Sequence, residues 1–75
     1  MKATNAAAQP AARKYYSLAV RYEDGIWACE FGSYKRSEVL EEREVYADQG
    51  LKTKIVESFD NQDSITFEFR RLNRK

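Results

Sequence analysis

Residues 15–31 read YYSLAVRYEDGIWACEF, and this stretch decides the predicted fold. Asp24-Gly25 is a preferred two-residue type I′ turn, and apolar and polar residues alternate on both sides of it. A two-residue loop places the apolar cross-strand pairs on one face: Tyr22 with Trp27, Val20 with Cys29, and Leu18 with Phe31. A register shifted by one residue would destroy this agreement. The stretch therefore predicts an antiparallel β-hairpin with one apolar face.

Cys29 is the only cysteine of the chain. It cannot form an internal disulfide, which fits a protein of the reducing cytoplasm. In the predicted register its side chain faces inward, opposite Val20. A buried, unreactive thiol is therefore expected.

A helix is predicted after the strand break at Gly32, from Tyr34 or Ser37 to Gln49. Acidic residues crowd its first turns, where the helix dipole favours them. Residues 51–59 are predicted to form a third strand.

The C-terminal segment fits two patterns. Ile65, Phe67 and Phe69 alternate as in a strand, whereas Ile65, Phe69 and Leu72 fit one face of a helix. Thr66 and the phenylalanines favour a strand. The predicted order is therefore β-β-α-β-β, an α+β fold with one helix packed on one face of a small sheet. The alternative is a helical C-terminal segment.

The length of 75 residues, or 8.8 kDa, allows one small domain. We assign residues 1–14 to a flexible, basic, alanine-rich arm, residues 15–72 to the domain, and residues 73–75 to a basic tail. A single core of this size is marginally stable, and a sheet with one helix leaves its other face uncovered. Val56 is among the apolar residues expected on that uncovered face. A homodimer that buries this face against a second copy, or that pairs edge strands, is therefore expected.

The net charge of +1 is divided unevenly along the chain. Residues 1–14 hold three cations and no acid, residues 70–75 hold four cations and no acid, and the body between them is therefore acidic. The predicted helix has one acidic side, with a valine among the carboxylates. This side, the acidic ridge, consists of Glu38, Glu41, Glu42, Glu44, Val45 and Asp48. Such a run is either a solvated face or a docking surface that attracts a basic partner.

Catalysis is not expected from this composition. The chain has no histidine, which removes the usual imidazole base and the ordinary Cys/His zinc site. Its three glycines are widely separated, so they form no phosphate-binding loop. We predict no catalytic residue, no metal site and no cofactor. No apolar stretch is long enough to span a membrane, and a cytoplasmic location is expected.

Residues 27–42 follow the pattern Trp27-x-x-x-Phe31-Gly32-x-Tyr34-x-Arg36-x-x-Val39-x-x-Glu42. The pattern resembles short proteins that bacteriophages and prophages encode and that have no assigned activity. The resemblance covers about residues 16–56, and the C-terminal segment of these proteins looks more helical. It implies an accessory protein of a phage or mobile element. Many such small proteins bind and block a host protein, CRISPR effectors included.

Two functions are therefore expected. The first is a non-enzymatic accessory protein in the host cytoplasm that binds a host defence protein or a phage protein through the acidic ridge and modulates or inhibits it. The alternative is a small nucleic-acid-binding module that contacts phosphates with its basic residues. These residues are Arg13, Lys14, Lys35, Arg36, Arg70, Arg71, Arg74 and Lys75.

Overall fold

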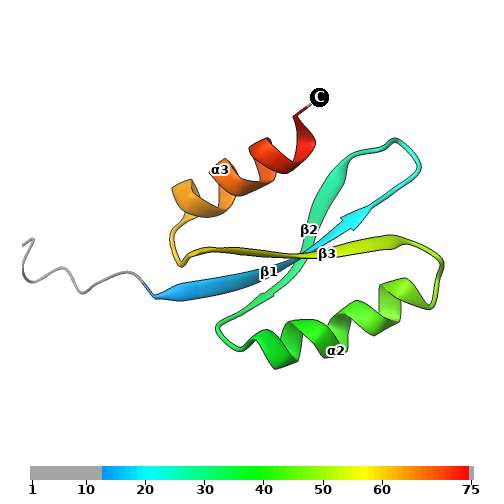
Figure 1. Cartoon of the computed structure of the whole chain (residues 1–75), viewed down its shortest axis with the longest axis horizontal. Helices are drawn as coiled ribbons and strands as arrows, with labels where there is room; N and C mark the ends of the chain where they lie inside the picture. Colours follow the sequence, from blue (N-terminus) through cyan, green and yellow to red (C-terminus); the bar gives the residue numbers. More distant parts are fainter. Residues whose placement is uncertain (1–12, 75) are drawn as a thin grey trace, which may run out of the picture.

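The computed structural model describes residues 13–74, in which three strands and two helices follow one another along the chain (Figure 1). The elements are β1 (Lys14–Arg21), β2 (Trp27–Ser33), α2 (Arg36–Ala47), β3 (Lys52–Phe59) and α3 (Gln62–Asn73). This arrangement confirms the α+β fold. The order is β-β-α-β-α, so the predicted fourth strand is wrong and the helical alternative for the C-terminal segment is correct.

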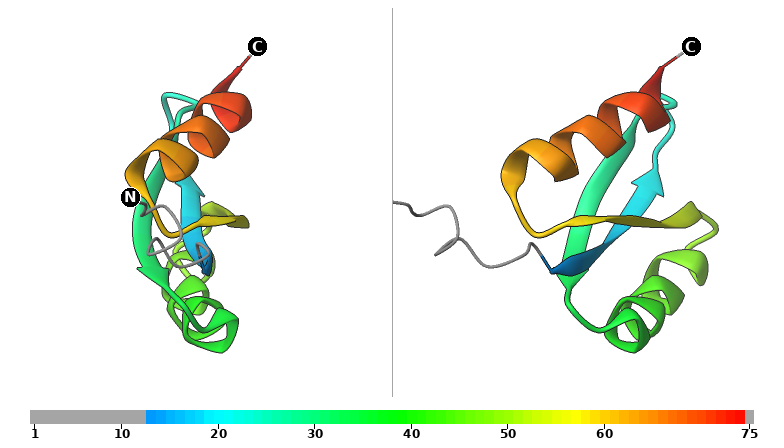
Figure 2. Two further views of the ribbon diagram at one scale, coloured as in Figure 1. Left: turned by 90° about the vertical axis from the view of Figure 1, so that its left-hand side faces the viewer. Right: turned by 60° about the vertical axis from the view of Figure 1, so that its left-hand side comes forward.

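The three strands form one antiparallel sheet in the order β2-β1-β3. Helices α2 and α3 lie on opposite sides of this sheet, as both views of Figure 2 show. The central strand β1 is therefore covered on both faces, and the four consecutive residues 17–20 are all buried. The sequence predicted one helix on one face, whereas the structure has three layers.

The hairpin loop contains three residues, not the two that Asp24-Gly25 predicted. The Gly25 amide donates to the Tyr22 carbonyl at 2.9 Å, and the Tyr22 amide donates to the Ile26 carbonyl at 3.3 Å. Gly25 has a φ of +82°, the left-handed conformation that the last residue of such a three-residue loop requires. The longer loop shifts the pairing near the turn, so that Val20 lies opposite Ala28.

A bulge then restores the predicted register farther from the turn. Leu18 pairs with Phe31, as predicted, but Ala19 pairs with Cys29, so that Glu30 is the extra residue of β2. Between the turn and the bulge, residues 27–29 of β2 therefore point to the opposite face from the one predicted. Cys29 is therefore exposed, and the buried thiol predicted from the sequence is wrong.

The hydrophobic core lies between the sheet and α2. Leu18, Val20 and Val39 are fully buried there. Half-buried side chains complete this layer: Tyr16, Phe31, Tyr46, Leu51 and Ile55. Val39 is the only buried residue of α2, so the helix rests on the sheet through a narrow strip.

Helix α3 is fixed at both ends. At its start, the Asn61 side chain accepts a 2.8 Å hydrogen bond from the Ser64 amide, which is an N-cap. At its end, the Asn73 side chain accepts from the Trp27 amide at 2.7 Å and donates to the Trp27 carbonyl at 3.1 Å. These two bonds join residues 46 positions apart and hold α3 against β2.

Because α3 covers the second face of the sheet, the argument for a homodimer changes. Val56, expected on an uncovered sheet face, is only 8% exposed. It lies on the α3 side of the sheet, because it pairs with Ser17 and not with a core-facing residue of β1. The homodimer stays a prediction, but the uncovered face that motivated it is occupied by α3.

The ends of the described region belong to regular elements. Lys14 begins β1 and Asn73 ends α3, with Arg74 as its C-cap. The remainder of the predicted arm, residues 1–12, and Lys75 of the predicted tail lie outside the described residues.

Candidate functional site

The outer surface of α3 carries an aromatic residue among arginines. Phe67, Arg70 and Arg71 stand three and four positions apart and form an exposed stripe of α3, with the two arginines at its edges, and Arg74 follows as the C-cap. All four are exposed, and Phe67 is 58% exposed. The Arg71 guanidinium carbon lies 5.8 Å from the centre of the Phe67 ring.

Strands β1 and β3 add cations to the same side of the sheet. Ala19 pairs with Lys54, and Arg21 pairs with Lys52. Because Leu18 and Val20 point toward α2, these alternate residues point to the α3 side. Lys54 and Arg71 of α3 line one hollow, which the carboxylates of Glu57 and Glu68 also line. We call this surface the basic face, and it consists of Arg21, Lys52, Lys54, Arg70, Arg71 and Arg74.

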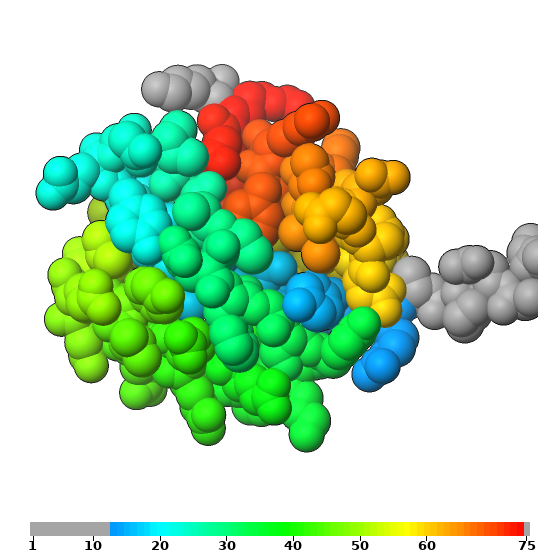
Figure 3. All heavy atoms as spheres, turned by 180° about the vertical axis from the view of Figure 1, so that it is seen from behind, coloured from blue at the N-terminus to red at the C-terminus, as the bar shows by residue number. Residues whose placement is uncertain are grey.

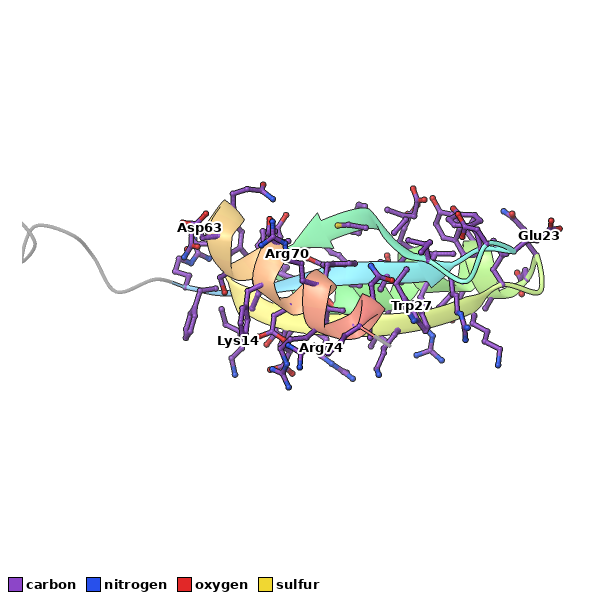
Figure 4. All side chains as sticks on the ribbon, turned by 90° about the horizontal axis from the view of Figure 1, so that it is seen from above. Lys14, Glu23, Trp27, Asp63, Arg70 and Arg74 are labelled. Carbon is purple, nitrogen blue, oxygen red and sulfur yellow. The ribbon has the colours of Figure 1, made fainter. Side chains whose placement is uncertain are left out.

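Figure 4 looks onto α3 and shows how these charges are arranged. Arg70 and Arg74 project on the two sides of the helix. Arg74 lies toward β3, on the same side as Lys14, whereas Asp63 and Glu23 lie toward β2.

The cations of the basic face have few carboxylate partners. Within residues 13–74 the ion pairs are Lys14 with Glu57 at 3.5 Å and Arg71 with Glu68 at 3.4 Å. Arg21 and Lys52 stand directly opposite each other, and like charges in this position destabilise a strand pair. The Arg21 Nε instead donates to the Gly25 carbonyl at 3.3 Å. The basic face therefore has one like-charge strand pair and a single ion pair within residues 13–74.

The structure separates the eight basic residues that the sequence nominated as phosphate contacts. Arg70 and Arg71 lie in α3, and Arg74 follows as its C-cap. The other nominated residues that the structure describes lie near the starts of β1 and α2. Arg13 stacks on the Tyr34 ring at 4.0 Å, and Lys14 pairs with Glu57. The others are Lys35 and Arg36 at the start of α2, and Lys75 outside the described residues.

Arg21, Lys52 and Lys54 were not nominated from the sequence. Their shared face depends on the pairing of β1 with β3, which joins segments about thirty residues apart. Alternation within a strand predicts which of its residues share a face. It does not predict that the faces of β1 and β3 lie side by side, because that depends on how the two strands pair.

The acidic ridge lies on α2, on the opposite side of the sheet from the basic face. Its residues Glu38, Glu41, Glu44, Val45 and Asp48 are exposed, and Glu42 is half-buried. Glu38 accepts a hydrogen bond from the Ser33 hydroxyl. The structure thus brings most of the predicted ridge together on one solvent-facing side, with Val45 at 51% exposure.

A cleft of about 450 Å³ separates β2 from α3 and borders the basic face. Trp27, Ile65 and Phe69 give it an apolar lining, and Cys29 and Arg70 are also among its lining residues. Figure 3 shows the molecule from this side, with β2 between α2 and α3.

Glu30, the bulge residue, holds the hydroxyl of Tyr22. The Tyr22 Oη donates to Glu30 Oε2 at 2.7 Å. This hydrogen bond favours the neutral phenol, and the nearby carboxylate charge opposes its ionisation, so the pKa of Tyr22 rises from 10.0 to about 12. The bond of Tyr34 to Asp60, 3.0 Å long, raises the pKa of Tyr34 in the same way.

A tyrosine titration can test the bulge. The pKa of Tyr22 is higher in the folded than in the unfolded chain. The hydrogen bond to Glu30 therefore stabilises the folded state below about pH 10, and this stabilisation is lost as the pH rises toward 12. In Glu30→Ala, we expect the ultraviolet absorbance titration to shift one tyrosine back toward pH 10. An unchanged titration curve would show that Glu30 does not hold Tyr22 in solution.

Within residues 13–74 there is no group of three side chains suited to hold a metal ion. No helix in this part of the chain is long and apolar enough to cross a membrane. Neither a protein-family model nor a curated protein nor a solved structure matches the chain.

Proposed function

We propose that this chain is a non-enzymatic nucleic-acid-binding module that contacts backbone phosphates through the basic face. The observation that carries the proposal is the gathering of six cations from β1, β3 and α3 on one folded surface. Only Arg71 among them has an ion-pair partner within residues 13–74. Phosphate contacts of this kind supply most of the affinity of non-specific nucleic-acid binding.

The acidic body predicted from the sequence is compatible with this function. Most of the ridge carboxylates project from α2, and the sheet separates them from the basic face. A nucleic acid lying along α3 and β3 would meet mainly positive charge. Counting charges along the sequence combines the two sides and conceals this difference.

The salt dependence of binding tests the proposed function. With six phosphate contacts, the logarithm of the affinity for a single strand should fall with the logarithm of salt concentration with a slope of about −4. Fluorescence anisotropy with a labelled oligonucleotide should then show about 250-fold weaker binding at about 200 mM than at about 50 mM salt. No binding at the lower salt concentration, or binding that ignores salt, would contradict the proposal.

A second candidate is the protein partner expected from the sequence. Val45 is exposed among carboxylates that form no ion pair within residues 13–74, which favours a basic host or phage protein that docks on the acidic ridge. A partner captured from a host lysate should be lost in Glu41→Lys, and retention of the same partner would exclude the ridge. The mobile-element origin and the inhibitory role stay predictions.

A further inference from the structure

We infer that the nucleic acid bound by the basic face is single-stranded, and that one of its bases stacks on Phe67. This inference rests on the proposed function and names its ligand class. Phe67 is the most exposed large hydrophobic side chain within residues 13–74, at 58%. It is not part of the core cluster, and Arg70 and Arg71 stand on the same stripe of α3.

An exposed aromatic ring among cations suits a single strand for a physical reason. Free bases present flat faces that stack on an aromatic side chain whatever their sequence, while the phosphates on either side pair with cations. In a duplex the bases are already paired and stacked, so that only the backbone would reach the basic face. Phe67 would then contribute almost nothing to binding.

The spacing of the stripe fits a few nucleotides. Phe67 lies seven residues before Arg74, the C-cap of α3, which corresponds to about 10 Å along the helix. Arg70 lies between them on the β2 side, and Arg71 shares a hollow with Lys54 on the β3 side. The helix segment that carries Phe67 therefore has cations on both of its flanks, where the phosphates next to a stacked base could pair with them.

Two phenylalanine variants test the inference. Phe59 has a similar exposure, 53%, but stands at the end of β3 outside the α3 stripe, so Phe59→Ala is a matched control. The ligands are a short oligo(dT) and a DNA duplex of the same length, measured by anisotropy at about 50 mM salt. Circular dichroism verifies that both variants keep their helix content.

We expect Phe67→Ala to weaken oligo(dT) binding about tenfold, the effect of losing one stacked base, and to leave duplex binding within about twofold. Phe59→Ala should leave both affinities within about twofold, and Phe67→Tyr should retain oligo(dT) binding. Equal oligo(dT) affinities for Phe67→Ala and Phe59→Ala would overturn the stacking inference. In that case, salt-dependent binding would still support the proposed function, whereas no binding of either DNA would refute both.

Discussion

Leu18→Ala should leave the chain unfolded at room temperature. Leu18 is fully buried in the central strand, pairs with Phe31 and Ile55, and belongs to the core cluster with Val39. Truncating a buried leucine costs about 2–5 kcal/mol, whereas a single core of this size supplies about 3–5 kcal/mol. Circular dichroism should show the loss of the cooperative thermal transition.

Cys29→Ser is the control for this prediction. Because the bulge at Glu30 leaves Cys29 exposed, a serine there should change the free energy of unfolding by less than about 0.5 kcal/mol. The register predicted from the sequence instead buries the thiol, and serine would then destabilise the domain. Two results would contradict the structure: a Leu18→Ala variant that keeps the cooperative thermal transition of the unmodified chain, or a Cys29→Ser variant that is strongly destabilised.

The hairpin shows how much a pattern of alternation can predict. It identified both strands and the Leu18–Phe31 pair, because apolar alternation fixes which face is buried. It did not predict the third loop residue or the bulge at Glu30. These two irregularities compensate each other beyond the bulge, so that the far end of the hairpin has the predicted register. The residues between them, among them Cys29, point the other way.

The position of helix α3 depends on contacts between residues that are distant in the sequence. The alternation of Ile65, Phe67 and Phe69 favours a strand. Asn61 is in fact the N-cap of α3, a signal that the sequence contained. The bonds between Asn73 and Trp27 hold the helix on the sheet, and no local pattern predicts them.

The same helix explains why the basic face escaped sequence analysis. The predicted fold divides the arginines near the C-terminus between the last segment of the domain and a tail, whereas Arg70 and Arg71 lie in α3 and Arg74 is its C-cap. Lys52 and Lys54 reach the same side only through the pairing of β3 with β1. The acidic ridge was predicted more successfully, because it depends on the periodicity of one helix alone.

Replacing Arg71 and Arg74 by glutamine should weaken the binding of single-stranded DNA by about a hundredfold at about 50 mM salt. Each replacement removes a charge-assisted contact to phosphate, worth about 1.5 kcal/mol or more. The salt slope should also become shallower, by about 1 to 2. Folding should be little affected, because both residues are exposed and the Arg71–Glu68 pair lies on the surface.

A control variant removes two positive charges from a different part of the surface. Lys35 and Arg36 are exposed at the start of α2, so Lys35→Gln with Arg36→Gln changes the net charge by the same amount. The ratio of the two dissociation constants for single-stranded DNA tests most directly whether the basic face is the binding surface. We predict that the α3 double variant binds at least about thirtyfold more weakly than the α2 double variant. Equal affinities would mean that only the overall charge matters, and would contradict the site.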